Sequence, residues 1–213
     1  MATVLSPPEQ RVLLDNITWE TYESLLQAHR DRSVPRFTYD RGQLEIMSPS
    51  IEHEELKDTV ALLINTLAEE MHINTRSFGS ATFRRADLQR GFEPDGCFYV
   101  QSATSIQGRT ELDLVVDPPP DLVIEIDLTS LSLPKLPIFA QLGVPEVWRA
   151  DGRQIHIFCL SGGQYIEPAE SSVFPGITAE VITRFVRESH TLDRLTWLRH
   201  VREWVRQREI GDS

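Results

Sequence analysis

Three carboxylates lie inside or directly beside strongly apolar segments of the sequence. Asp95 precedes Gly-Cys-Phe-Tyr, and Glu125 and Asp127 alternate with aliphatic residues in Leu-Val-Ile-Glu-Ile-Asp. Residues i and i+2 of a strand share a face, so Glu125 and Asp127 are expected to point the same way. Burying an unpaired carboxylate is costly, and a divalent cation would compensate the charge. Carboxylate oxygens and a strand carbonyl suit Mg²⁺ or Mn²⁺. The alternatives are a strand end that reaches solvent, or pairing with an arginine.

Lys135 is the second residue that could do chemistry. It lies ten residues after Glu125 and follows the turn-like segment Leu-Thr-Ser-Leu-Ser-Leu-Pro. If the chain folds back over the strand end, a lysine beside a metal-bound water can stabilise hydroxide or a developing phosphate charge. The spacing alone fits a solvated surface lysine equally well.

Other well-known site motifs are absent from the sequence. It contains no Gly-x-x-x-x-Gly-Lys phosphate loop, no Gly-x-Gly-x-x-Gly, no Gly-x-Ser-x-Gly and no His-Glu-x-x-His. Cys97 and Cys159 lie too far apart for a zinc site, and we expect them to be free thiols in strands.

The composition is that of an ordinary globular domain of 213 residues, with 40% hydrophobic and 25% charged residues. The net charge of −11 excludes a generally basic protein that coats DNA, although a local basic surface is compatible with it. No apolar run approaches the roughly 20 residues of a membrane helix. The N-terminus lacks the basic and apolar regions of a secretion signal. We therefore expect a cytoplasmic protein that has no membrane partner.

Hydrophobic periodicity and turn residues predict a mixed α/β (α+β) protein. The predicted division is an extended N-terminal arm at 1–16, a main domain at 17–187 and a C-terminal amphipathic helix at 188–213. Helices are expected at 18–28, 52–72, 131–142, 178–187 and 192–208. Strands are expected at 36–39, 43–47, 75–78, 82–84, 92–100, 121–127, 146–149, 154–159 and 164–166.

Two groups of arginines are candidates for phosphate contacts. One surrounds the strands that lead to Asp95, and the other occupies the C-terminal tail. The tail also has the apolar spacing of a helix that packs on the domain or on a second subunit. The first group is Arg76, Arg84, Arg85, Arg90 and Arg109; the expected apolar face of the tail is Leu195, Leu198, Val201 and Val205.

Three ordered motifs resemble the Uma-type family of restriction-endonuclease-like proteins, which belongs to the PD-(D/E)XK nuclease superfamily. They are Glu-Pro-Asp95, Pro-Pro-Asp-Leu-Val-Ile-Glu125 and Gly143-Val-Pro-Glu-Val-Trp148, and they follow a Met-Ser-Pro…His53 segment before a helix. The resemblance covers residues 17–185. It implies a restriction-endonuclease-like core in which helices flank a central mixed sheet.

The resemblance also implies a metal site. Asp95 and Glu125 match the metal-binding carboxylates of the family, and the carbonyl of Ile126 would complete the protein ligands. Asp127 occupies the position of the usual catalytic lysine, so the expected replacement is Lys135 from the following helix. Asp127 is a further possible ligand.

His53 matches the family histidine at the head of the first core helix, where it would touch Asp95 or substrate. Its alternative role is a hydrogen bond at the helix terminus. The resulting hypothesis is a Mg²⁺- or Mn²⁺-dependent DNA endonuclease, acting as a homodimer whose two sites serve the two strands. The alternatives are a catalytically inactive nuclease-fold protein that binds a partner or forms a structural homodimer, and a hydrolase of another phosphoester.

Overall fold

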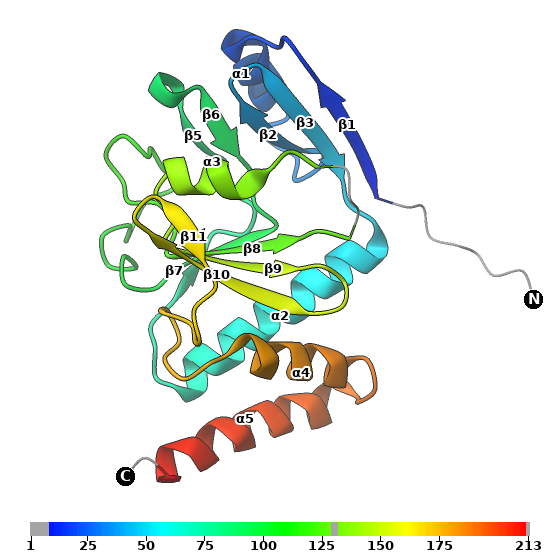
Figure 1. The fold of residues 1–213 in the computed structure, drawn as a ribbon, viewed down its shortest axis with the longest axis vertical. Coiled ribbons are helices and arrows are strands. Elements are labelled where there is room, and N and C mark those ends of the chain that lie inside the picture. Colours follow the sequence, from blue (N-terminus) through cyan, green and yellow to red (C-terminus); the bar gives the residue numbers. More distant parts are fainter. Residues whose placement is uncertain (1–8, 129–131, 212–213) are drawn as a thin grey trace, which may run out of the picture.

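The computed structural model describes residues 9–128 and 132–211, which form five α-helices and two β-sheets (Figure 1). The helices are α1 (Trp19–Ala28), α2 (Ile51–Glu70), α3 (Lys135–Gln141), α4 (Ala179–Ser189) and α5 (Arg194–Gly211), with a 3₁₀ turn at Ala86–Leu88. The strands are β1 (Gln10–Leu14), β2 (Arg36–Asp40), β3 (Gln43–Ser48), β4 (Arg76–Ser77), β5 (Phe83–Arg85), β6 (Arg90–Phe92), β7 (Gly96–Tyr99), β8 (Leu122–Ile126), β9 (Glu146–Ala150), β10 (Ile155–Ser161) and β11 (Gln164–Ile166).

The first sheet, here called the N-terminal sheet, has the antiparallel order β1-β3-β2-β6-β5 and carries α1. Its β2–β3 hairpin turns at Arg41 and Gly42, whose positive φ angles of 47° and 96° suit a two-residue hairpin turn. Residues 10–14, expected only as part of an extended arm, form the edge strand β1 along β3. The predicted core contained one central sheet, so this N-terminal sheet is an addition to it.

The second sheet, here called the central sheet, has the order β11-β10-β9-β8-β7-β4. The β8–β9 pair is parallel and the other pairs are antiparallel, so this is the predicted mixed sheet. Along β8, Ile124 and Ile126 join the apolar cluster formed with α2, α4 and α5. Val123 joins the cluster on the other face, which contains Ile138 of α3. The alternation of a strand therefore turns residue 125 towards α3.

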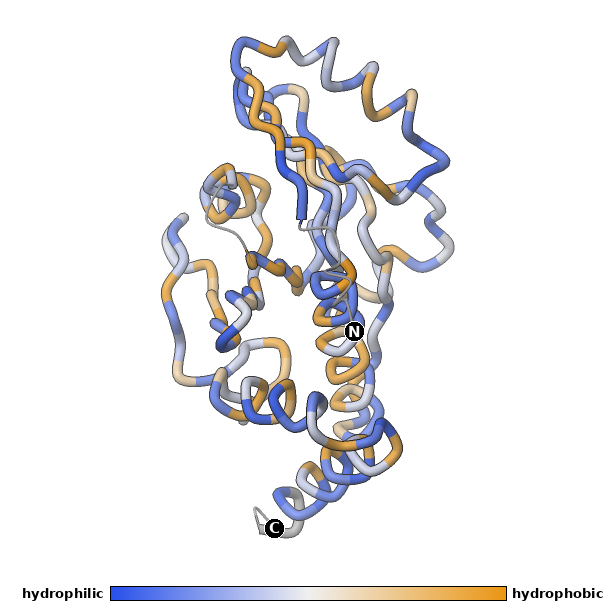
Figure 2. The backbone as a smooth tube through the Cα atoms, turned by 90° about the vertical axis from the view of Figure 1, so that its right-hand side faces the viewer, coloured by the Kyte–Doolittle hydropathy of each residue, from blue (hydrophilic) through white to orange (hydrophobic). Residues whose placement is uncertain are grey.

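Helix α2 begins where the sequence indicates. The side chain of Ser50 caps it by accepting a hydrogen bond from the backbone N–H of His53 at 3.2 Å. Hydrophobic and hydrophilic residues alternate along α2 and along α5 (Figure 2). The apolar face of α2 packs on β8, and this fixes the head of the helix at the end of that strand.

Helix α5 packs on the described domain itself, against α2 and α4. Its buried face consists of Trp197, Val201 and Val205, whereas Leu195 is 73% exposed, so its predicted place on the apolar face is wrong. Leu195 lies in the first turn of α5 and is exposed to solvent. Arg206 of α5 also pairs with Glu70 of α2 at 2.7 Å. Within the described residues, no helix is long and apolar enough to cross a membrane.

Candidate functional site

Asp95 lies directly before β7 and is 3% exposed. Its Oδ1 accepts hydrogen bonds from Nε2 of His53, at 2.8 Å, and from Nη1 of Arg36. Its Oδ2 accepts a hydrogen bond from the backbone N–H of Ile126 at 2.7 Å. One carboxylate thus joins β2, the head of α2 and the end of β8.

Glu125 lies on β8 and faces α3, as the strand alternation requires. Its Oε1 accepts a hydrogen bond from Nζ of Lys135, while Oε2 is buried without a hydrogen-bond partner among the described residues. Asp127 is close by: its Oδ1 lies 3.8 Å from Nη2 of Arg11 and likewise has no hydrogen-bond partner there. Within the described residues, neither oxygen receives a hydrogen bond, although Oδ1 of Asp127 keeps its long ion pair with Arg11.

Lys135 is the first residue of α3, and its side chain is only 9% exposed. The chain does fold back over the end of β8, although Pro134 and Pro137 flank the lysine. Besides Glu125, the ammonium lies 3.5 Å from Oε1 of Glu45. The structure thus brings the four predicted side chains of Asp95, Glu125, Lys135 and His53 into one cluster.

Four charged residues of this cluster were not predicted: Arg11, Arg36 and Glu45 lie in the N-terminal sheet, and Glu9 directly precedes it. Glu9 lies 2.5 Å from Nδ1 of His53 and 2.5 Å from Nε of Arg11. Arg36 holds Asp95, and Glu45 approaches Lys135. Glu45 lies between apolar residues of β3, which is the same signal that identified Glu125, whereas Arg36 is the first residue of β2.

Together, burial and neighbouring charges lower the pKa of Asp95 and raise the pKa values of Glu125 and His53. Burial alone would raise the pKa of Asp95, but the hydrogen bond from His53 and the charge of Arg36 lower it to about 2. Burial raises the pKa of Glu125 to about 7, against the opposing charge of Lys135. Burial opposes ionisation of His53, but its bonds to Asp95 and Glu9 raise the pKa of the ring to about 9. Asp95 is thus held ionised beside a protonated histidine.

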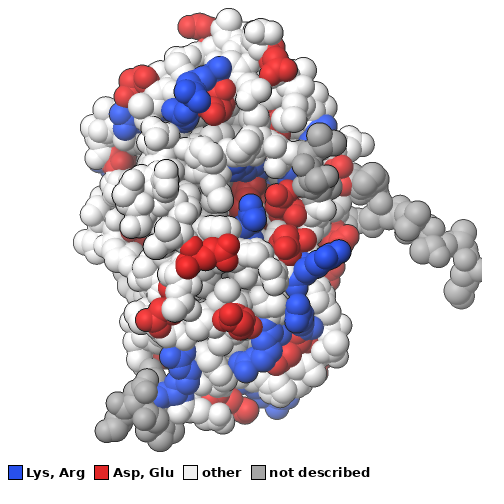
Figure 3. All heavy atoms as spheres, viewed as in Figure 1, with Lys and Arg blue, Asp and Glu red and all other residues white. Residues whose placement is uncertain are grey.

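The carboxylates fit a hydrated magnesium ion better than a fully enclosed one. In the part of the chain that the structure describes, no three His, Cys, Asp or Glu side chains form a preformed metal group. Mg²⁺, however, commonly keeps several waters and binds through one or two carboxylates. A cavity of about 200 Å³ is lined by Glu125, Asp127 and Lys135. Figure 3 shows acidic and basic side chains meeting in a hollow near the middle of this face. The carboxylate oxygens of Glu125 and Asp127 that receive no hydrogen bond from the described residues suit such an ion.

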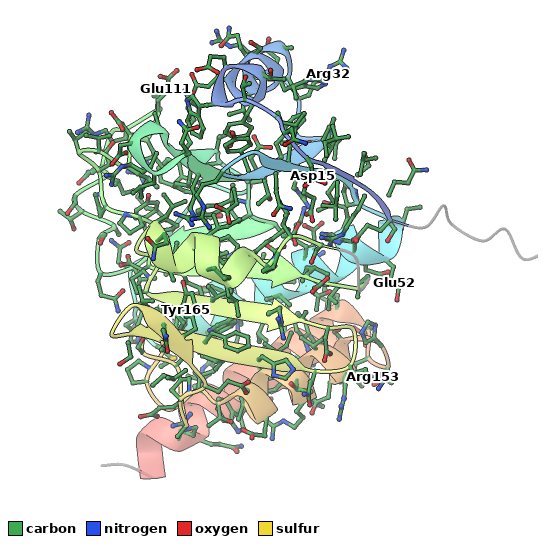
Figure 4. The ribbon with its side chains drawn as sticks, turned by 45° about the horizontal axis from the view of Figure 1, so that its top comes forward. Asp15, Arg32, Glu52, Glu111, Arg153 and Tyr165 are labelled. Atoms are coloured by element: carbon green, nitrogen blue, oxygen red, sulfur yellow. The ribbon has the colours of Figure 1, made fainter. Side chains whose placement is uncertain are left out.

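A second cavity, of about 470 Å³, borders Leu128, which follows Asp127 directly. Arg153 and Arg187 line it. Glu52, at the head of α2, also lines this cavity, and it lies on the same side of the molecule as Arg153 (Figure 4).

Most of the arginines predicted near Asp95 are instead paired with carboxylates. The pairs are Arg84 with Glu23 at 2.9 Å, Arg85 with Asp87 at 2.6 Å, Arg90 with Asp40 at 2.9 Å and Arg109 with Asp117 at 3.1 Å. Their charge is therefore largely balanced within the protein.

This architecture, a mixed sheet between helices with a buried charged cluster at the end of β8, is that of a nuclease-like α/β protein. The sequence matches the model of the Uma2 family, described as "Putative restriction endonuclease", over residues 19–180. The chain therefore belongs to the Uma2 family, as the motifs indicated.

A solved structure supports the same fold. A crystal structure from Anabaena variabilis, titled as a putative nuclease belonging to DUF820, matches with a TM-score of 0.56 and 15% sequence identity. The match covers 80% of this chain and 99% of that chain. At this identity the likeness shows the fold alone, and it confirms the predicted fold class. No significant match was found among curated proteins.

The two raised pKa values predict that the free energy of unfolding falls as the pH rises from 6 to 9.5. The pKa of Glu125 rises from 4.5 to about 7 and that of His53 from 6.5 to about 9. A raised folded-state pKa contributes stability that is complete below the unfolded-state value and is lost as the pH rises through the folded-state value. The contribution of Glu125 to the free energy of unfolding is therefore lost by about pH 7, and that of His53 by about pH 9.

Urea unfolding at a series of pH values measures this slope. His53→Gln should flatten the part above pH 7, whereas His190→Gln, at an exposed position outside the cluster, should leave it unchanged. A wild-type stability that is constant or rises over this range would contradict the prediction.

Proposed function

We propose that this protein is a metal-dependent DNA endonuclease that hydrolyses phosphodiester bonds. The observation that carries the proposal is the position of Glu125. It is buried beside Asp95 and Lys135, with Oε2 unpartnered among the described residues and with a cavity next to it. Membership of the Uma2 family supports a nuclease activity.

Asp95 and Glu125 are the proposed ligands of Mg²⁺ or Mn²⁺, together with the backbone carbonyl of Ile126 and the carboxylate of Asp127. A bound ion of this kind would acidify the attacking water and offset charge on the scissile phosphate. These carboxylates come from two neighbouring strand ends, which rigid backbone pairing holds in place.

The remaining residues of the cluster hold charges and protons. Lys135 keeps an ammonium beside Glu125, where it can stabilise hydroxide or the developing phosphate charge. His53 donates a hydrogen bond to Asp95 and keeps that carboxylate ionised and oriented. Arg36 does the same through Oδ1. The site thus combines the ammonium of Lys135, which can stabilise hydroxide, with carboxylates that are held in fixed positions.

DNA is the proposed substrate, and the strand would pass the cavity beside Leu128. Arg153 and Arg187 line that cavity and offer phosphate contacts in a protein whose net charge is −11. A homodimer would present one site to each strand of a duplex. Sedimentation of the protein with and without duplex DNA tests this assembly.

Cleavage of supercoiled plasmid tests the proposed activity. The wild-type chain should cut with Mg²⁺ or Mn²⁺ and stop cutting in EDTA. A double variant, Asp95→Ala with Glu125→Ala, purified in parallel should be inactive, because no carboxylate pair remains to bind the ion. Equal cutting by both preparations would show contamination and would remove the support for the proposal.

A second candidate function is a catalytically inactive nuclease-fold protein that binds a partner or forms a structural homodimer. The observation that favours it is charge balance: Asp95 pairs with Arg36, and Glu125 pairs with Lys135. Titration calorimetry separates the two candidates. The nuclease should release or absorb heat with Mn²⁺, and the inactive protein should not.

A further inference from the structure

Glu45 connects the N-terminal sheet to helix α3 at the site. It lies on β3 of the N-terminal sheet and is 1% exposed. Its carboxylate accepts a hydrogen bond from the backbone N–H of Leu133 at 2.8 Å and one from Nη1 of Arg11 at 3.1 Å. Its Oε1 also lies 3.5 Å from Nζ of Lys135. One buried carboxylate therefore contacts both the backbone that leads into α3 and the first side chain of that helix.

We infer that Glu45 is a positioning residue of the site, which fixes the ammonium of Lys135 beside Glu125. The inference rests on the proposed function, in which Lys135 assists the attacking water. A lysine side chain has four flexible carbons, so its ammonium is placed only if both the backbone and the charge are held. The bond to Leu133 holds the backbone two residues before Lys135, and the charge of Glu45 holds the ammonium.

A second anion near Lys135 is needed for a physical reason. A buried ammonium requires a counterion, and in this structure Glu125 is one such partner. A carboxylate that also binds a divalent cation through its other oxygen offsets less of the ammonium charge. Glu45 offers a second partner, and the hydrogen bond from Nη1 of Arg11 at 3.1 Å holds its Oε1 in place. Both oxygens of Glu45 already accept donors, which leaves it poorly suited to be a metal ligand itself.

The experiment uses the fact that the chain has only two lysines, Lys57 and Lys135. Acylation of the native protein by an amine-reactive ester, followed by mass spectrometry, gives the labelling ratio of Lys135 to Lys57 within one molecule. Glu45→Gln keeps an oxygen that can accept from Leu133 but loses the charge, so the ratio should rise severalfold. An unchanged ratio would overturn the inference.

A matched control separates positioning from general loosening. Asp121 is also a buried carboxylate, and it accepts backbone hydrogen bonds from Val100 at 2.7 Å and Ser102 at 2.9 Å. Asp121→Asn makes the same chemical change without touching Lys135. The ratio should stay at the wild-type value in this variant. An equal rise in both variants would assign the effect to stability and overturn the inference.

The plasmid assay supplies the second readout. Glu45→Gln should lower kcat by about 10- to 100-fold with KM unchanged, the effect expected when a catalytic group is misplaced. Adding Glu45→Gln to Lys135→Ala should cause no further loss, because the two residues act as one unit. If Lys135→Ala slows cleavage but Glu45→Gln cuts at the wild-type rate, the inference is overturned.

The labelling ratio also keeps the inference separate from the proposed function. If the wild-type protein cuts no DNA at all, the proposed activity fails. The ratio of Lys135 to Lys57 then still reports whether Glu45 places the lysine, because that measurement needs neither metal nor substrate.

Discussion

Replacing Arg36 by alanine should lower the free energy of unfolding by about 3–5 kcal/mol, the range found when one partner of a buried ion pair is removed. The side chain of Arg36 is 6% exposed and that of Asp95 is 1% exposed. Arg36 also pairs with Glu54 at 2.7 Å. Without the guanidinium, Asp95 remains buried and ionised with His53 as its main neighbouring cation. The hydrogen bonds from His53 and the backbone N–H of Ile126 remain, so the loss should stay within this range and not reach the cost of a fully uncompensated charge.

Urea unfolding measures this loss, and Arg84→Ala is the matched control. Arg84 pairs with Glu23 at 2.9 Å, but the two side chains are 49% and 42% exposed. An exposed pair of this kind contributes at most about 1 kcal/mol. Combining Arg36→Ala with Asp95→Asn should recover part of the loss, because the orphaned charge is then removed. Equal effects of Arg36→Ala and Arg84→Ala would contradict the buried ion pair.

The predicted site residues share a signal that local sequence can carry. Asp95 and Glu125 are carboxylates beside apolar strand residues, and the motifs around them point to the same pair. Lys135 was predicted from its distance along the chain, and the structure places it against Glu125. One alternative considered for the carboxylates was pairing with an arginine, and Arg36 does pair with Asp95. The sequence thus identified the acids together with Lys135 and His53, but not the partners Arg36 and Glu45.

The partners were missed because they depend on pairing between distant segments. Arg36 reaches Asp95 across 59 residues of sequence, and Glu45 reaches Leu133 across 88. The residues next to Arg36 and Glu45 in the sequence do not indicate which distant segment packs against their strands. A charged residue beside apolar strand residues was the available signal, and it was applied to Asp95 and Glu125 but not to β2 or β3.

The helices and strands of the core were predictable for physical reasons that the edge strand lacks. Helix α2 has a capping serine and regular apolar spacing, and both are local. Strand β1 has no comparable local signal. Its residues Val12 and Leu13 are 51% and 44% exposed, because an edge strand with one partner buries little surface. Its position depends on pairing with β3, which lies more than 30 residues later. The extended arm was therefore predicted without its sheet.

Glu125→Gln should separate catalysis from folding more sharply than any other single change. Glutamine has the same shape, but its neutral amide cannot bind a divalent cation as a carboxylate does. Cleavage should fall on the order of 10³-fold, as when one group that stabilises a transition state is removed. Burial raises the pKa of Glu125 to about 7, so its charge is already disfavoured in the folded protein. Glu45 also remains beside Lys135 as a counterion, so the melting temperature should fall much less than in Glu146→Gln.

Glu146→Gln is the matched control, because it should have the opposite profile. Glu146 is fully buried on the neighbouring strand β9 and accepts hydrogen bonds from Nε1 of Trp148, Oγ of Ser171 and the backbone N–H of Ser172. It holds the segment after β11 and touches no residue of the charged cluster. Its loss should lower the melting temperature by several degrees while the folded protein still cuts plasmid. If Glu125→Gln lowered stability as Glu146→Gln does and left cleavage intact, Glu125 would be a structural carboxylate and the proposed metal site would be wrong.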